Sequence, residues 1–155
     1  MIDFNNLEKY KENNRIEAKQ AIGGLPESIW ESYSAFANAE GGVILLGVEE
    51  LKDKSLHAVE DISAPEKLIT EFWDIINDKT KVSINILCED DVQIRYADGN
   101  LVIAVYVPKA ERKDRPVYIG GDVYSGSYIR KGEGDCRCSH DEVEKMLCKA
   151  KLYFD

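Results

Sequence analysis

The chain has 155 residues, of which 44% are hydrophobic and 32% charged, the size and composition of one ordinary globular domain. Its 20 basic and 29 acidic residues give a net charge of −9, which opposes general attraction to nucleic acid or to an anionic membrane, so nucleic acid would need a local basic patch. The first residues are polar, and the longest uncharged stretch, residues 100–108, is shorter than the ~20 residues of a membrane-spanning helix. We therefore expect a cytoplasmic protein with reduced cysteines.

The first half of the chain predicts a helix that ends at two glycines and leads into a buried strand. Apolar residues recur at helical spacing between Ile29 and Ala37, which places them on one stripe. Gly41 and Gly42 can end this helix in a left-handed conformation. Residues 43–48 are apolar and free of charge, as is typical of a central strand covered on both faces.

The remaining pattern changes from helical spacing to alternation. Asp98 and Gly99 stand between two alternating runs and predict a two-residue hairpin turn. In the first half we also expect a short helix over 3–11, a strand over 15–19, Pro26 at the start of the first long helix and a charged loop over 50–61. A helix capped by Ser63 and Glu66 follows, and then strands over 82–87, 92–96 and 101–107. The last expected elements are a strand pair over 117–119 and 127–131 and a helix from Ser139, capped by Glu142, to about Ala150. This order predicts a single α+β domain over residues 1–155, with a core of about 12–150: a mixed, largely antiparallel sheet with a central apolar strand, packed by about three to four helices.

Three residues near the amino terminus are candidates for catalysis. If 15–19 is a strand, Glu17 and Lys19 point to the same face, and Glu12 precedes them. Paired carboxylates can hold Mg²⁺ or Mn²⁺ while a lysine stabilises charge on a phosphate, as in metal-dependent nucleases. The alternative is a solvated ion pair of the kind found on most protein surfaces.

Glu49 is a further acidic candidate because it directly follows the central strand. The carboxyl ends of central strands in α/β sheets commonly open into ligand crevices. The alternative is that Glu49 is the first exposed residue of a loop.

The segment 109–137 is the part of the chain that could present a positive face. It holds seven basic and five acidic residues, a net charge of +2, and tyrosines that could stack on bases are interspersed in it. Phosphate contact and a solvated loop are both open interpretations. The candidate nucleic-acid-binding residues are Arg112, Lys113, Arg115, Arg130 and Lys131.

Zinc and ATP are not expected as cofactors. Cys136, Cys138 and His140 are spaced too tightly for the usual paired zinc ligands, and Cys148 falls on a predicted helix. No glycine is followed by the lysine and hydroxyl residue of a phosphate loop, so ATPase chemistry is unsupported.

Several of these motifs together resemble the Schlafen-related AlbA-type domain, a family labelled DNA-binding. The resemblance covers most of the chain. The matching stretches are the string Ser-Ala-Phe-Ala-Asn-Ala-Glu-Gly-Gly at 34–42, Leu-Leu-Gly-Val at 45–48, the spacing Glu-x4-Glu-x-Lys at 12–19, Arg-Pro-Val-Tyr at 115–118, Tyr-Ile-Arg-Lys-Gly at 128–132 and Gly-Asp-Cys-Arg-Cys-Ser at 134–139.

This resemblance implies an α+β domain of the kind found at the amino end of bacterial transcriptional regulators, sometimes labelled divergent AAA or ATP-binding. In Schlafen nucleases it implies a metal-dependent, RNA-cleaving site with three acids. By motif position these are Glu12, Glu17 and Glu49 here, with Glu49 where Asp is usual. A winged-helix region usually follows in the bacterial regulators, so the chain could be a lone or an excised domain.

Three hypotheses follow from the sequence. The preferred one is a nucleic-acid-binding module of regulator type, acting on DNA or structured RNA, with no membrane partner. The second is a metal-dependent ribonuclease using Mg²⁺ or Mn²⁺. The third is a protein-interaction domain that forms a homo-oligomer and retains a vestigial site.

Overall fold

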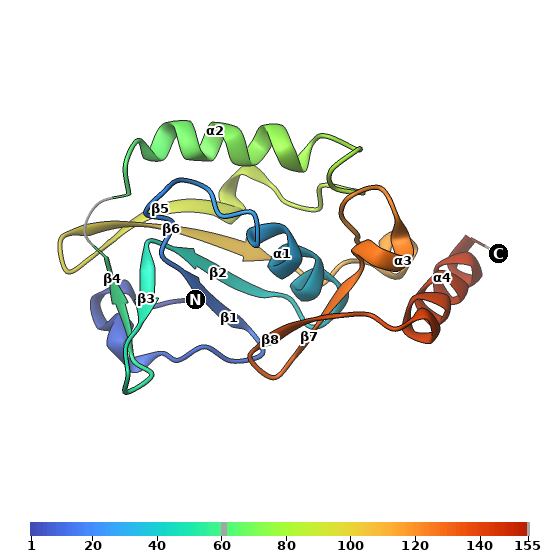
Figure 1. Cartoon of the computed structure of the whole chain (residues 1–155), viewed down its shortest axis with the longest axis horizontal. Coiled ribbons are helices and arrows are strands. Elements are labelled where there is room, and N and C mark those ends of the chain that lie inside the picture. Colours follow the sequence, from blue (N-terminus) through green and yellow to red (C-terminus); the bar gives the residue numbers. More distant parts are fainter. Residues whose placement is uncertain (60–61, 155) are drawn as a thin grey trace.

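The computed structural model describes the backbone of residues 1–59 and 62–154 and the side chains of this range up to residue 152 (Figure 1). The strands are β1 (Ile16–Lys19), β2 (Gly42–Leu46), β3 (Val48–Glu50), β4 (Leu56–Ala58), β5 (Val92–Ala97), β6 (Asn100–Val107), β7 (Tyr128–Lys131) and β8 (Gly134–Arg137). The α-helices are α1 (Ile29–Asn38), α2 (Pro65–Ile76), α3 (Val123–Gly126) and α4 (His140–Phe154), and the 3₁₀-helices are η1 (Phe4–Lys9), η2 (Glu89–Asp91) and η3 (Arg112–Asp114).

The main sheet has four strands in the order β1-β2-β6-β5. β1 and β2 are parallel, because the intervening chain crosses over through α1, and the other neighbours are antiparallel. Asp98 and Gly99 turn between β5 and β6 with φ values of 53° and 78°, which confirms the predicted hairpin. The predicted α+β class with a mixed, largely antiparallel sheet is likewise confirmed.

Both faces of β2 are buried, as its uncharged run predicts. Ile44 and Leu46 face the cluster formed with α1 and α2, whereas Val43 and Leu45 face η1 and the β3–β4 hairpin. In Figure 1, α2 lies along one side of the sheet, and η1 and the hairpin lie on the opposite side. The sheet is therefore the middle layer of the molecule.

The helix α1 ends where the two glycines predict, but the glycines have different roles. Gly41 adopts a left-handed φ of 77°, and its N–H donates to the carbonyl of Phe36. Gly42 is needed for space, because a Cβ there would lie 2.7 Å from the Phe36 ring and 2.8 Å from the Arg15 carbonyl oxygen. The glycine pair thus closes the helix and lets the next strand approach it.

The predicted strand over 43–48 is wrong at its end, because Gly47 breaks it. Gly47 has a φ of 86°, so β2 stops at Leu46 and the chain enters a separate hairpin. The range predicted as a charged loop over 50–61 therefore contains the end of β3, the hairpin turn and β4, and its residues 60–61 lie outside the described part.

Other local expectations are also corrected. α1 begins at Ile29 rather than at Pro26, and α2 follows Ala64 with no side-chain cap from Ser63. The segment 82–87 is not a strand. Val82 forms an isolated bridge with Ile119, and the Tyr33 hydroxyl group donates to the Ile84 carbonyl and accepts from the Ile86 N–H.

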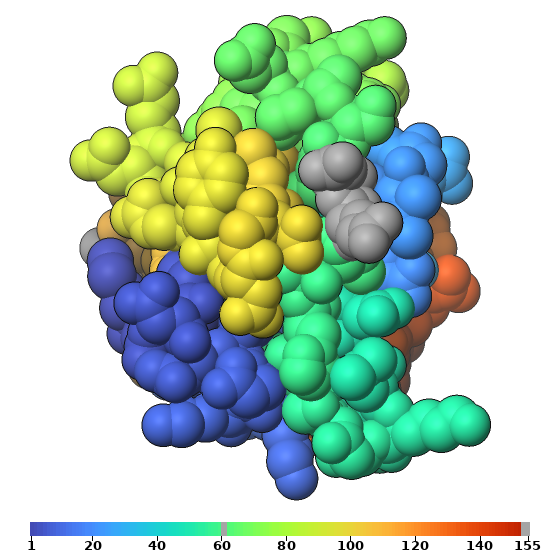
Figure 2. Space-filling view, turned by 90° about the vertical axis from the view of Figure 1, so that its left-hand side faces the viewer, coloured from blue at the N-terminus to red at the C-terminus, as the bar shows by residue number. Residues whose placement is uncertain are grey.

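At the carboxyl end, β7 pairs with β8 instead of with residues 117–119, which form only isolated bridges, from Tyr118 to Ser127 and from Ile119 to Val82. The capping box of Ser139 and Glu142 is confirmed by hydrogen bonds of 2.9 and 3.1 Å. Figure 2 shows η1, the β3–β4 hairpin and the β5–β6 turn gathered at one end of the molecule. Within the described range, no helix is both long and apolar enough to cross a membrane.

Candidate functional site

The candidate residues of β1 lie on one face of the strand, as alternation predicts. The Nζ of Lys19 is 3.5 Å from Oε2 of Glu17 and donates to the Ser28 hydroxyl group at 3.0 Å. The Glu17 carboxylate is thereby held near the start of α1.

Arg130 of β7 completes this arrangement from the interior. Its side chain is 1% exposed and lies over the Phe36 ring, 4.8 Å from the ring centre. Its guanidinium group donates to Oε1 of Glu17 at 2.9 Å and to Oδ1 of Asp135 at 2.7 Å. Nε and Nη2 donate to the carbonyls of Asn13 and Ile16. Five hydrogen bonds use the donors of Arg130, so this side chain is not available to an external ligand.

Glu12 lies beside this network and is itself partly buried. The N–H of Ala18 donates to its Oε1 at 3.0 Å. Burial raises the pKa of the Glu12 carboxyl group, and the neighbouring carboxylates of Glu17 and Glu50 raise this pKa further. The Glu12 carboxyl group therefore binds a proton more readily than an ordinary glutamate does.

Glu49 does not join Glu12. Adjacent residues of a strand point to opposite faces, and it is Glu50 that acts on the Glu12 carboxyl group. Glu49 pairs with His57 across the β3–β4 hairpin and is half-buried. The left-handed Gly47 sets this outcome, since it starts β3 in a new direction after β2.

The acidic residues do not fit a bound metal ion. Among the described residues, no group of three His, Cys, Asp or Glu side chains could hold one. The Glu17 carboxylate already pairs with Arg130 and Lys19. A guanidinium group thus supplies the positive charge that a metal ion would bring to these acids.

Two polar residues of the motif at 34–42 have a structural role in the interior. Asn38 accepts from the Val117 N–H at 2.8 Å and donates to the carbonyls of Val117 and Tyr128, both at 2.9 Å. Ser34, one turn earlier, donates to the Val117 carbonyl and accepts from the Tyr128 N–H. Together they join α1 to the segment before α3 and to β7.

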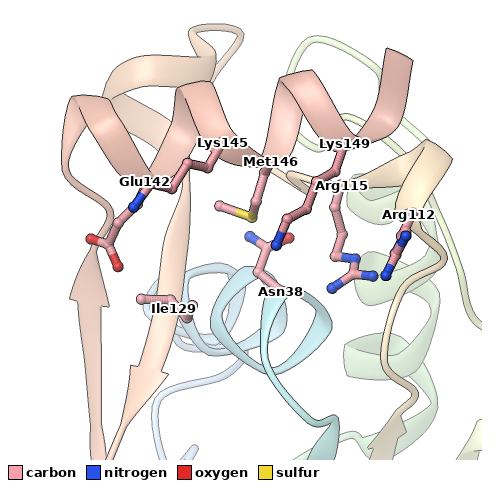
Figure 3. Close-up of a pocket in the computed structure, with 8 residues that line it drawn as sticks. All are labelled: Asn38, Arg112, Arg115, Ile129, Glu142, Lys145, Met146 and Lys149. Carbon is pink, nitrogen blue, oxygen red and sulfur yellow. The ribbon is translucent and has the colours of Figure 1, made fainter. Parts of the chain in front are cut away.

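A separate pocket of about 340 Å³ opens between η3 and α4. Figure 3 shows that cationic side chains enter it from both elements. The lining residues are Asn38, Arg112, Arg115, Ile129, Glu142, Lys145, Met146 and Lys149. Four basic residues and one acidic residue therefore surround a cavity in a protein whose net charge is −9.

The periodicity of the two elements explains how the cations converge. Arg112 and Arg115 are three residues apart, and side chains at that spacing align in a 3₁₀ turn. On α4, Glu142, Lys145, Met146 and Lys149 fall at i, i+3, i+4 and i+7, which places them on one face of the helix. This face of α4 is opposed to the η3 turn across the pocket.

The predicted nucleic-acid-binding residues separate into three groups. Arg112 and Arg115 line the pocket, whereas Arg130 is internal. Lys131 is exposed beside the pocket, with its Nζ 3.5 Å from Oε2 of Glu142, and Lys113 lies on η3 outside the lining. Lys145 and Lys149 were not among the residues predicted from the sequence, although their spacing with Met146 indicates a common helix face.

The tyrosines and cysteines are less suited to a ligand. Tyr128 is buried, and Tyr124 stacks on His140 with ring centres 4.7 Å apart. Burial raises the pKa of the Cys138 thiol to about 11, so the reactive thiolate is disfavoured at neutral pH.

The fold and the pocket define a small α+β domain with a localised cationic site. A family model described as Schlafen, AlbA_2 matches residues 12–139, and the chain belongs to this family. None of the curated proteins is similar enough to match the chain.

Several solved structures share the fold, and two of them serve as examples. One is the N-terminal domain of a protein from Nitrosomonas europaea that is named as related to RecG, an ATP-dependent DNA helicase. Its sequence is 27% identical to this chain and its TM-score is 0.63, and the match covers 89% of this chain and 94% of that domain. A protein of Corynebacterium diphtheriae is 17% identical with a TM-score of 0.57, over 86% of this chain and 24% of that one. The second likeness concerns the fold alone.

Proposed function

We propose that this protein binds nucleic acid through the surface around the η3–α4 pocket. The observation that carries the proposal is the convergence of Arg112, Arg115, Lys145 and Lys149 on one cavity. Phosphate oxygens are the ligands that clustered arginine and lysine side chains favour. The surrounding negative charge restricts binding to this site, because the rest of the surface repels a polyanion.

The comparisons support the same class of ligand. The chain belongs to the Schlafen, AlbA_2 family, for which the sequence resemblance implies DNA binding, and the relative from Nitrosomonas europaea is part of a protein named for a DNA helicase. DNA is therefore the first ligand to test, with structured RNA beside it. For the cell, we propose that the protein acts in the cytoplasm as a module of a transcriptional regulator.

The direct test is the affinity for fluorescein-labelled DNA and RNA at several salt concentrations. Four neutralised phosphates correspond to a slope of about −3 for log affinity against log salt on a single strand. A variant with Arg112, Arg115, Lys145 and Lys149 changed to Gln should lose binding and flatten this slope.

A control with the same change in net charge keeps the pocket intact. It replaces four exposed lysines on other elements with Gln, namely Lys9, Lys11, Lys52 and Lys79. This control should retain most of the affinity. Equal losses in the two variants would contradict a localised site, and undiminished binding in the first variant would reject the pocket surface.

A further inference from the structure

We propose that the η3–α4 pocket holds one nucleotide that carries a terminal phosphate, with the phosphate at its arginine end. This inference rests on the proposed function, because it assigns a subsite within the same surface. It adds that the site distinguishes a phosphorylated strand end from an uninterrupted backbone.

Three of the four cations of the pocket lie at one end. In Figure 3, Arg112, Arg115 and Lys149 lie together at one side, while Ile129, Glu142 and Lys145 lie at the other. A nucleotide carries its charge on the phosphate, whereas its base has an apolar face. The phosphate is thus directed to the arginines and the base toward Ile129.

The Arg115 side chain is not fixed to the protein through its Nε. This atom is buried and has no hydrogen-bond partner among the described residues. A guanidinium group can bind a phosphate through two parallel N–H donors, and no hydrogen bond of Nε opposes a turn of Arg115 toward such a ligand. Arg130 shows the contrast, because its donors are all used within the protein.

The volume limits what can enter. About 340 Å³ lies near the lower end of the ~300–1,000 Å³ typical of small-molecule sites. A water molecule accounts for ~30 Å³ of liquid, so a phosphate ion alone would leave much of the pocket filled with water. A duplex, whose major groove alone is ~12 Å wide, must remain outside. A single nucleotide at a strand end is the ligand that suits both the size and the charge.

A terminal phosphate also has more charge than an internal one. An internal phosphodiester carries one negative charge, whereas a terminal monoester carries about −1.5 to −2 at neutral pH. Three cations at one end of the pocket favour the more highly charged group. The preference for a phosphorylated end should therefore be measurable against the same strand with a hydroxyl end.

The test compares short oligothymidines that have a 5′-phosphate, a 3′-phosphate or only hydroxyl ends. We expect one phosphorylated form to bind about tenfold more tightly, which is ~1.4 kcal/mol. Arg115→Gln should remove this preference. Lys113→Gln, which removes the same charge from the same turn outside the lining, should keep it. Circular dichroism of both variants confirms that they are folded.

A second variant blocks the pocket while it keeps every cation. Met146→Trp places a larger side chain at the wall and should abolish the end preference, but salt-dependent binding of the strand should persist. Thymidine monophosphate and inorganic phosphate, used as competitors, distinguish the sources. Displacement by the mononucleotide but not by phosphate supports a nucleotide site.

The outcomes distinguish this inference from the proposed function. Equal, tight binding of phosphorylated and hydroxyl-ended strands would overturn the nucleotide subsite and leave the proposed function intact. No binding of any strand would overturn both. An end preference that persists in Arg115→Gln and Met146→Trp would place the subsite elsewhere and overturn the assignment.

Discussion

Arg130 and Glu17 form an ion pair of 2.9 Å that joins β7 to β1 over a separation of 113 residues. Asp135 on β8 binds the same guanidinium group at 2.7 Å and accepts from the Ser32 hydroxyl group at 2.5 Å. The β7–β8 hairpin is thereby held against the main sheet and α1 by charge as well as by packing.

Arg130→Met should destabilise the fold by about 3–5 kcal/mol, because it leaves Asp135 without its cation and Glu17 with Lys19 alone, in a site of low exposure. Urea denaturation measures the change. Adding Glu17→Gln and Asp135→Asn should recover part of the loss. Lys109→Met, which breaks an exposed pair with Glu40, should cost no more than ~1 kcal/mol. Similar losses in the two single variants would mean that the Arg130 network is not a buried one.

Asn38→Ala should destabilise the protein through the hydrogen bonds that buried backbone groups lose. The Val117 N–H and the Tyr128 carbonyl would each lose a hydrogen bond to Asn38, at about 1–3 kcal/mol for a buried group, whereas the Val117 carbonyl keeps the one from Ser34. Asn77→Ala is the control, because Asn77 is exposed and accepts one side-chain hydrogen bond. If thermal unfolding gave equal midpoints for the two variants, the interior role of Asn38 would be refuted.

Gly42→Ala should cost about 1–3 kcal/mol, since the added methyl group would overlap the Phe36 ring and the Arg15 carbonyl. Gly23→Ala is a matched control: a Cβ there would meet nothing within 4 Å. Chemical denaturation of both variants checks the difference. A tolerated Gly42→Ala would show that α1 and β2 can move apart freely.

Glu12→Gln should stabilise the protein at neutral pH. Because the folded-state pKa of Glu12 is raised, the contribution of this group to stability is greatest below its unfolded pKa and is lost as pH rises through the folded value. Gln keeps an acceptor for the Ala18 N–H but carries no charge. Urea midpoints of wild type and variant should therefore differ at pH 7 and converge near pH 4. Glu8→Gln, at an exposed position, serves as the charge-matched control, and a variant less stable than wild type at pH 7 would contradict the expectation.

Mg²⁺ or Mn²⁺ should leave the unfolding midpoint unchanged, and RNA incubated with either ion should stay intact. The reason is that Glu17 is engaged by Arg130 and that Glu49 stands apart from Glu12. Calorimetric titration with Mn²⁺ and gel analysis of tRNA measure the two effects. Metal-dependent cleavage that disappears in Glu17→Gln would contradict this and restore the ribonuclease hypothesis.

Local signals predicted the α1–β2 joint and the hairpin at Asp98 because each depends on neighbouring residues. The apolar stripe, the left-handed Gly41 and the uncharged run act within one turn or one strand. The break of the strand at Gly47 was not predicted, because a glycine in an apolar run is compatible with either a continuous strand or a break. The choice is made by the packing of Ile62, whose side chain would lie 2.8 Å from a Cβ at Gly47.

The candidate site was less predictable because it depends on contacts between distant segments. Arg130 and Lys131 are adjacent and point to opposite faces, so one of them had to be internal. Only the pairing of β7 with β8, which brings Asp135 beside Arg130, shows which one it is. Similarly, the spacing of Lys145 and Lys149 predicts a common helix face but not the η3 turn that the face meets.

The family match ends at residue 139, and α4 begins with the next residue. One wall of the pocket, with Arg112 and Arg115, therefore belongs to the shared framework, whereas the wall with Lys145 and Lys149 lies beyond it. A change confined to α4 would therefore alter one wall of the pocket and leave the main sheet and the Arg130 network in place. The binding proposed for the pocket and the stability of the fold can thus be altered separately in this domain.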